Sequence, residues 1–530
     1  MKVSVWHLLY CIMLRKRRVH FYLVLVLFTV YLINGLIAIP RNSVTYDEMD
    51  HWSYGKRILK GRPQKVYTYD DATAMPITGL NAIPRAIEQV LNSKLSKTDG
   101  GLSDIMHGRY MTLLVCLLIG VYIYKWSKEL FGEWGGILSL FLFVFCPNIN
   151  AHDTLLTTDA YTALLALTTF YYFYKFVKKS GWKYFILFSL SFGIAQVSKY
   201  SLLHLLPIFA LLCLFILISR KTIFRNWKKN FVRLIVLFVI AIGVINTAYL
   251  FNGIGKKLEA YNFRSATFQS FQQIPVISRI PLPLPVPYVE GIDITYHMTE
   301  LGAGNILAGG RNYLNGEFRT DRGFWNYYLL MLLYKTPIPY LVIFLLLALL
   351  YARNVKRFSI FSSEFIIVFG LLYYLNFFSF FLSIQSGNRH IILFYPLLYV
   401  LAGRLATVAW KKKYKLAGAV ILAVYSLAGF YFYFPNLISY TNEFISNKTT
   451  AYKIMADASL DYGQGHYALE KYLTKHPDVK IATTEPQQGK IVIGVNDFVD
   501  LYGTGKFEWL KKYKPVGNIN YCYLLFEVPQ

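Results

Sequence analysis

Charged residues are scarce in this sequence. Of its 530 residues only 16% are Asp, Glu, Lys or Arg, whereas 55% are hydrophobic. A soluble enzyme of this length carries more charge on its surface, so the composition excludes that class. The sequence therefore indicates an integral membrane protein whose main solvent is the lipid bilayer.

Cysteines are also few, and no internal repeat is found. Cys11, Cys116 and Cys213 lie in or beside apolar runs, while Cys146 and Cys522 are isolated. We expect no structural disulfide, and these cysteines do not identify a redox compartment. The lack of a repeat of solenoid period excludes a repeat protein.

Acidic residues number only 29 against 55 basic ones, which gives a formal net charge of +26. Such an excess could indicate nucleic-acid binding. The Lys and Arg residues, however, lie in short clusters between apolar runs, as the positive-inside rule of membrane proteins requires. We therefore expect a bilayer partner and no nucleic acid.

Apolar runs that can cross about 30 Å of hydrocarbon predict a polytopic, all-α bundle of about eleven transmembrane helices. They lie near residues 20–39, 110–124, 134–147, 160–177, 183–198, 201–219, 231–251, 337–351, 364–382, 390–409 and 416–434. Basic clusters occupy every second connection, at 15–18, 125–128, 175–183, 220–229, 353–357 and 411–415. That side is predicted to be cytoplasmic, with the N-terminus, and the first helix to be an uncleaved span of an inner (plasma) membrane protein.

The long connections, 40–108 and 252–336, are predicted to lie on the extracytoplasmic side. They belong to a transmembrane domain at 1–434, which a tail at 435–530 follows. The tail carries ten Lys and no Arg against ten acids, so the basic excess belongs to the cytoplasmic loops. A helical pattern at 467–475 and extended segments at 490–495 and 521–528 predict a small extracytoplasmic α/β domain.

Acidic residues and a histidine follow directly on the first span, at Asp47, Glu48, Asp50 and His51. Such groups at the membrane surface are costly unless they are hydrated, paired or catalytic. A structural explanation also fits, because Thr45 and Glu48 have the spacing of a capping box. The pattern alone does not decide between the two.

Further charged residues begin or end spans on the same side. Asp159 opens the fourth span, where a helix N-cap would explain it. Arg109, Lys199 and the pair Arg389–His390 lie at the same level, where snorkelling toward lipid headgroups would explain each of them singly.

Taken together, these residues suit sugar transfer from a lipid phosphate. That reaction needs a carboxylate that accepts a proton from the acceptor hydroxyl, and cations that stabilise the departing phosphate. We therefore expect Arg109, Lys199 and Arg389 to converge in one pocket, with an apolar groove that holds the carrier's isoprenoid tail.

Over nearly its whole length the chain resembles the dolichyl-phosphate-mannose protein mannosyltransferase-like superfamily, glycosyltransferase family 39, whose bacterial members include the lipid A aminoarabinose transferases. The similar segments occur in the same order along the chain. They are 47–48 with His51 and Gly55, Arg109, 130–132, 146–159, 198–201, 313–318 with 323–328, 334–339, 388–396, 438–443 and 458–464.

This resemblance implies a GT-C architecture, a polyprenyl-phosphate monosaccharide donor and inversion at the anomeric carbon. It implies that Asp47 is the catalytic base, that Glu48, His51 and Asp159 support it or bind the acceptor, and that Arg109, Lys199, Arg389 and His390 bind the donor phosphate. The acceptor would be a glycan, lipid or protein hydroxyl. No cofactor is expected; Glu48, Asp50 and His51 could hold a divalent metal by composition, but none is expected to be required.

One segment departs from the family pattern. Many bacterial relatives have His-Pro-Pro in the first outer loop, where this chain has Thr73 to Pro76, which puts recognition by that loop in doubt. The chain also lacks the inserted β-trefoil domain of eukaryotic protein mannosyltransferases. Two other classes remain as alternatives: a transporter or flippase of a lipid-linked sugar, for which broken helices at the bilayer midplane are expected, and a non-catalytic envelope assembly protein.

Overall fold

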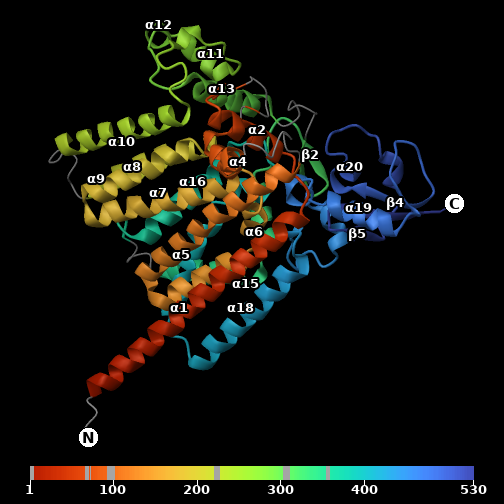
Figure 1. Ribbon diagram of the computed structural model, residues 1–530, viewed down its shortest axis with the longest axis horizontal. Coiled ribbons are helices and arrows are strands. Elements are labelled where there is room, and N and C mark those ends of the chain that lie inside the picture. Colours follow the sequence, from red (N-terminus) through yellow and green to blue (C-terminus); the bar gives the residue numbers. More distant parts are fainter. Residues whose placement is uncertain are drawn as a thin grey trace.

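The computed structural model describes residues 5–65, 71, 73–91, 102–219, 227–302, 311–353 and 359–529. Most of these residues are helical (Figure 1). The helices of the first half are α1 (Val5–Ala38), α2 (Glu48–Leu59), α4 (Gly79–Leu91), α5 (Leu102–Val144), α6 (Pro147–Asp153), α7 (Asp159–Lys179), α8 (Trp182–Gln196), α9 (Leu205–Ser219) and α10 (Trp227–Ala248). Those of the second half are α11 (Ala266–Gln272), α12 (Pro275–Ser278), α13 (Val286–Leu301), α14 (Tyr327–Lys335), α15 (Ile338–Arg353), α16 (Ser363–Phe380), α17 (Phe394–Ala402), α18 (Lys412–Tyr433), α19 (His466–Lys475) and α20 (Val495–Val499).

Six helices of the described residues are long and apolar enough to cross a membrane. They lie at Arg18–Arg41, Ile105–Val144, Tyr200–Ser219, Trp227–Ala248, Ser363–Phe380 and Lys412–Tyr433, and α14 with α15 forms a pair bent by 119° that would make a seventh. The chain is therefore an integral membrane protein, whereas the total of eleven spans stays a prediction. The basic clusters at 220–229 and 353–357 fall largely outside the described residues.

Helix α5 contains two of the predicted spans, and the chain changes direction between them at Gly132. This residue has φ of +76° and ψ of −178°, a conformation that only glycine adopts without strain. The two halves of α5 therefore have different directions, as the predicted break between 124 and 134 requires.

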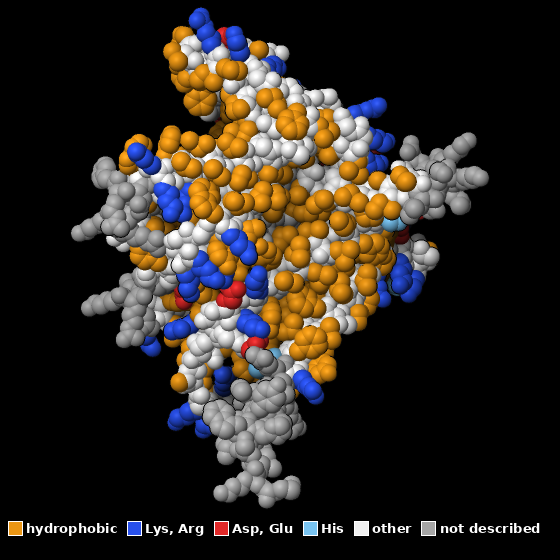
Figure 2. Space-filling model, turned by 60° about the vertical axis from the view of Figure 1, so that its left-hand side comes forward, with side chains coloured by type: hydrophobic (Ala, Val, Ile, Leu, Met, Phe, Trp, Pro, Cys, Tyr) orange, Lys and Arg blue, Asp and Glu red, His pale blue; other side chains and the backbone are white. Residues whose placement is uncertain are grey.

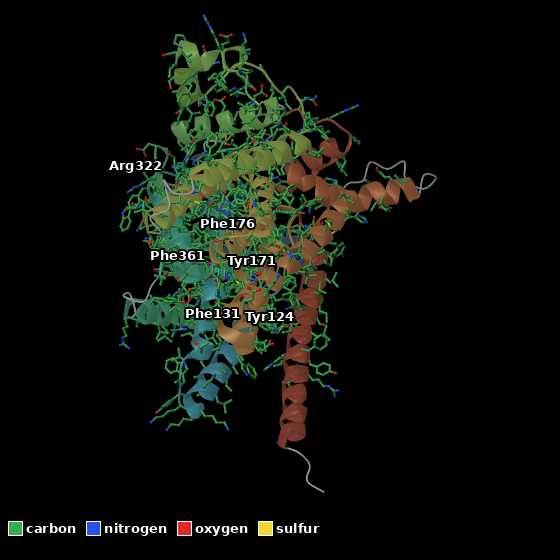
Figure 3. All side chains as sticks on the ribbon, turned by 90° about the vertical axis from the view of Figure 1, so that its left-hand side faces the viewer. Tyr124, Phe131, Tyr171, Phe176, Arg322 and Phe361 are labelled. Carbon is green, nitrogen blue, oxygen red and sulfur yellow. The ribbon has the colours of Figure 1, made fainter. Side chains whose placement is uncertain are left out.

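Aromatic side chains fill the bundle between α5 and α7. The ring of Trp126 lies 5.5 Å from that of Tyr171 and 6.0 Å from that of Tyr174. Figure 3 shows Tyr124 and Phe131 of α5 and Tyr171 and Phe176 of α7 in this part of the bundle. Offset and edge-to-face aromatic pairs contribute beyond their burial, so this layer fixes how the two helices pack.

The tail contains the predicted strands and helix. Its sheet has the order β3 (Val479–Ile481), β4 (Gly489–Gly494), β6 (Tyr523–Val528) and β5 (Gly517–Ile519); β3 and β4 are parallel, and the other pairs are antiparallel. A separate hairpin joins β1 (Asn312–Leu314) and β2 (Glu317–Arg319). Buried residues of the tail, among them Ile438, Leu460 and Phe526, belong to the same core as the bundle. The domain boundary at 434–435 stays a prediction.

Candidate active site

A cavity of about 670 Å³ opens between α2, the start of α7, α13 and the segment that precedes α17. One end is polar and the walls are largely apolar. The polar end is formed by Asp47, Asp50, His51, Asp159, Lys199, Arg389 and His390, and the apolar walls by Leu203, Pro207, Met298, Phe377, Phe378, Phe381 and Leu382. This combination suits a ligand that has a charged head and a hydrocarbon chain.

Asp47 lies immediately before α2, and its carboxylate faces the cavity, where 38% of the side-chain surface is exposed. Arg389 donates from Nη1 to both Asp47 and the hydroxyl of Tyr462, and Tyr462 also hydrogen-bonds to Asp47. Burial raises the pKa of the Asp47 carboxyl, but Arg389, His51 and these hydrogen bonds outweigh it, and the pKa falls below its usual value. Asp47 is therefore ionised at neutral pH.

His51 lies one helical turn after Asp47, so both side chains line the same cavity. Burial lowers the pKa of the His51 imidazole more than the nearby carboxylates raise it, and the ring is neutral at neutral pH. Its Nδ1 is buried and finds no hydrogen-bond partner among the described residues, and the same holds for Nε of Arg389. Unpaired buried donors and acceptors beside a cavity point to a bound ligand or water that would satisfy them.

Asp159 and Lys199 form a second ion pair in the cavity. Asp159 opens α7 and is buried, while a quarter of the Lys199 side chain is exposed. His152 lies behind them, with its Nδ1 3.8 Å from Asp159. Burial lowers the pKa of His152 to about 4, so this histidine is neutral. The charged partner of the Asp159 carboxylate is therefore Lys199. A helix N-terminus also favours a negative charge at Asp159.

Arg109 and Glu48 do not line the cavity, contrary to the expectation that the three cations share one pocket. Both side chains are fully buried against each other, with Arg109 Nη2 2.6 Å and Nε 2.7 Å from the Glu48 carboxylate. Arg109 also donates to the carbonyls of Ile39, Asn42 and Ser43. Every terminal nitrogen of the guanidinium is thus occupied within the protein, and the pair holds the chain between α1 and α2 in place.

Glu48 also makes half of the predicted capping box, although the N-cap of α2 is Asp47 and not Thr45. Its Oε2 accepts from the backbone N–H and the hydroxyl of Thr45, at 2.8 and 3.0 Å. Its Oε1 accepts from the N–H of Leu156 at 2.8 Å. We therefore interpret Glu48 as a positioning residue that sets the direction of its neighbour Asp47.

His390 and Tyr462 complete the polar end. His390 lines the cavity, and its Nδ1 lies 3.0 Å from the hydroxyl of Tyr328 in α14. Tyr462 was not singled out from the sequence, although it lies in the segment 458–464 that resembles the family. Its position beside both Asp47 and Arg389 depends on a tail that folds back over the bundle, which no local spacing indicates.

Among the described residues, no group of three His, Cys, Asp or Glu side chains is arranged to hold a metal ion. In particular, the Glu48 carboxylate pairs with Arg109 and does not form a metal site with Asp50 and His51. The expectation that no metal is required is not tested by this geometry and stays a prediction.

Comparisons with known proteins agree with the predicted relationship. Residues 103–245 match the model of the family described as dolichyl-phosphate-mannose-protein mannosyltransferase. A search of curated proteins finds no match. The resemblance drawn from the sequence is thus confirmed by a family model that covers about a quarter of the chain.

Solved structures share the fold. ArnT from Cupriavidus metallidurans bound to undecaprenyl phosphate is 11% identical with a TM-score of 0.50, and the match covers 92% of this chain and 75% of that one. The archaeal oligosaccharyltransferase AglB from Archaeoglobus fulgidus, in complex with an inhibitory peptide and a dolichol-phosphate, is 14% identical with a TM-score of 0.50. That match covers 86% of this chain and 60% of AglB. The chain therefore has GT-C glycosyltransferases as its structural neighbours.

Proposed function

We propose that this chain is a membrane glycosyltransferase that moves a monosaccharide from a polyprenyl-phosphate donor to a hydroxyl group of a glycan, lipid or protein. One observation carries the proposal: Asp47, held by Arg389 and Tyr462, faces a cavity whose polar end contains Lys199 and whose walls are apolar. Two structural neighbours contain a lipid phosphate, undecaprenyl phosphate in ArnT and dolichol-phosphate in AglB, which supports a lipid phosphate as the donor's carrier.

In the proposed reaction, Asp47 accepts the proton of the acceptor hydroxyl while the hydroxyl oxygen attacks the anomeric carbon. The bond between that carbon and the phosphate oxygen breaks, and the carrier leaves as a polyprenyl phosphate. Attack from the face opposite the leaving group inverts the anomeric configuration. Because the pKa of Asp47 is lowered, the carboxylate is ionised and available as a base over a wide pH range.

Lys199 and Arg389 are the cations proposed to meet the phosphate. Each is already paired with a carboxylate, Lys199 with Asp159 and Arg389 with Asp47. Arg389 keeps its Nε without a partner among the described residues, and Lys199 is partly exposed to the cavity, so both have hydrogen-bonding capacity left. Since two cations can balance the developing charge, we propose that no metal ion is required.

The apolar walls are proposed to hold the first isoprenoid units of the carrier. Phe377 and Phe378 of α16, Phe381 directly after it, and Leu203 and Pro207 all line the cavity. Apolar contacts of this kind give affinity without dependence on chain length, because the remaining isoprenoid units stay in the bilayer.

We further propose that the cavity opens on the extracytoplasmic face of an inner (plasma) membrane, with eleven spans, a cytoplasmic N-terminus and an extracytoplasmic tail. The alternation of basic clusters supports this topology. A reporter that is active only in the cytoplasm, fused after Gln530, should be inactive; activity would overturn the topology.

The test is transfer of a labelled sugar from synthetic polyprenyl-phosphate donors by the purified protein, with and without a chelator. Asp47→Asn should lose activity by about 10²- to 10⁴-fold while folding normally. Asp478→Asn serves as the control, because Asp478 is an exposed acid of the tail that pairs with Lys490. Mass spectrometry of cell-surface glycans and glycoproteins from a deletion strain would supply the acceptor.

Two outcomes would overturn the proposal. If Asp47→Asn keeps near-full activity while the chelator abolishes transfer by the wild type, the base assignment and the metal-free mechanism are both wrong. If the protein transfers no sugar but moves a lipid-linked sugar across vesicle membranes, it is a flippase.

A further inference from the structure

The segment between α10 and α13, residues 252–285, forms a projection that we name the α11–α12 unit. It extends beyond the ends of α10 and α13 (Figure 1). The unit has a small core of its own, in which Leu258, Tyr261 and Phe263 pack against Val289 of α13. Its fold is thus not a loose loop but an ordered structure with a buried side.

Other residues of the unit are apolar and exposed. The large ones are Phe271, Ile274, Val276, Ile277 and Ile280, and Val276 is 79% exposed. They all lie within residues 271–280, from the end of α11 through α12 to Ile280, and we refer to them as the apolar patch. Exposure of such a cluster to water is energetically unfavourable, so the cluster marks a surface that contacts lipid or another protein.

The unit follows directly on α10, which is long and apolar enough to cross a membrane. That helix exposes Phe231, Val232, Leu234, Ile235, Phe238 and Val239. At its end, Leu250 and Phe251 both have left-handed backbone conformations, with φ of +52° and +56°, and both side chains are exposed. Two bulky residues in this strained conformation turn the chain toward the unit and keep apolar side chains outside. Figure 2 shows hydrophobic side chains both on the projection and on the bundle below it.

Basic residues accompany the apolar patch. Residues 252–285 contain Lys256, Lys257, Arg264 and Arg279 and a single acid, Glu259. Lys257 and Arg279 are exposed. Apolar side chains next to exposed cations match the boundary between acyl chains and phosphate headgroups.

From this continuity and charge we infer that the α11–α12 unit inserts its apolar patch into the bilayer, at headgroup level on the side of the cavity. The patch thus contacts lipid and not a second protein. Two carboxylates of α13 bind the unit. Asp293 accepts from the backbone N–H groups of Arg264 and Ser265 and from the Ser265 hydroxyl. Glu300 accepts from the backbone N–H groups of Ala266 and Thr267. Because Thr295, Met298 and Thr299 of α13 line the cavity, insertion of the unit holds one cavity wall at the lipid surface.

The test places a fluorescent label on the full-length protein in lipid nanodiscs. Val276→Cys, and separately Ile274→Cys, is labelled with a polarity-sensitive dye, and quenching by a nitroxide-labelled lipid is measured. Val516→Cys is the matched control, because Val516 is 62% exposed but lies in the tail, just before β5. Labelled wild type gives the background from the native cysteines.

We expect lipid quenching at positions 274 and 276 to be several-fold stronger than at 516, and to increase when anionic lipid replaces neutral lipid. Quenching at both positions equal to that at 516 would show that the patch faces water and would overturn the inference. Dye shielded from both water and lipid would show a protein interface instead, and would overturn it as well.

Discussion

Glu48 and Arg109 lie 61 residues apart in the sequence and form an ion pair of 2.6 Å in which neither side chain is exposed. Asp47, the neighbour of Glu48, pairs with Arg389 at the cavity instead. Two adjacent acids therefore have different tasks: one fixes the chain and the other faces the proposed substrate.

This division predicts that Arg109→Met and Glu48→Gln lower thermal stability strongly. Each leaves a buried charge without its partner, which typically costs about 3–5 kcal/mol. Differential scanning fluorimetry in detergent measures the effect. Lys128→Met is the control, because Lys128 pairs with Glu133 at 2.8 Å with both side chains partly exposed, and such pairs contribute about 0–1 kcal/mol. An Arg109→Met protein of normal stability but without activity would instead support a role in donor binding.

Tyr462→Phe should lower sugar transfer about tenfold without a loss of stability. The substitution removes only the hydroxyl that contacts Asp47 and Arg389, so the carboxylate loses one hydrogen bond and its pKa rises toward the usual value. The acid limb of the pH–activity profile should therefore move to higher pH. Tyr467→Phe, on the half-buried side of α19, is the control. An unchanged acid limb would show that Tyr462 does not influence the pKa of the proposed base.

Stability should depend on pH through Asp461. Burial raises the pKa of this carboxyl to about 6. The folded protein then binds more protons than the unfolded chain between about pH 4 and pH 6, so stability falls as pH rises through this window and stays low above it. Asp461→Asn keeps the oxygen that accepts from Gly463 and should abolish this fall, which corresponds to about 3 kcal/mol. The test is to measure the melting temperatures of both proteins at pH 5 and at pH 8. If the variant and the wild type differ by the same amount at both pH values, the prediction is wrong.

Lys335→Met should loosen the tail. The buried ammonium of Lys335 donates to the carbonyls of Ile438 and Ser459, both at 2.6 Å, and thereby fastens two segments of the tail to α14. Without it, the tail should become sensitive to limited proteolysis, and activity should fall because Tyr462 is displaced. Lys490→Met, which removes only an exposed pair with Asp478, should change neither. Equal protease resistance of the Lys335→Met protein would show that the tail is held by other contacts.

Local features of the fold were predictable because they depend on nearby residues. Apolar runs and basic clusters indicate membrane helices wherever they occur, and short runs rich in β-branched and aromatic residues indicate the strands β4 and β6. The helix of the tail also lies within one residue of its predicted bounds, at His466–Lys475. The bent pair α14 and α15 was less predictable, because two prolines at 337 and 339 permit either a straight start or a turn.

The candidate site was predictable in composition but not in arrangement. Asp47, His51, Asp159, Lys199, Arg389 and His390 all line one cavity, whereas Arg109 and Glu48 do not. Spacing places residues on one side of the membrane, but it does not say which of two adjacent acids points inward. Their catalytic and binding roles stay predictions until the variants are measured.

By itself, the sequence determined that this chain spans a membrane and that its acids and cations gather at one surface, because hydrophobicity and charge act locally along the chain. Only the tertiary structure decided that Arg109 neutralises Glu48, that Arg389 meets Asp47 across 342 residues, and that Tyr462 lies beside them. Such pairs form when helix packing and the docking of the tail bring distant groups into an environment of low dielectric, where an unpaired charge is too costly to remain.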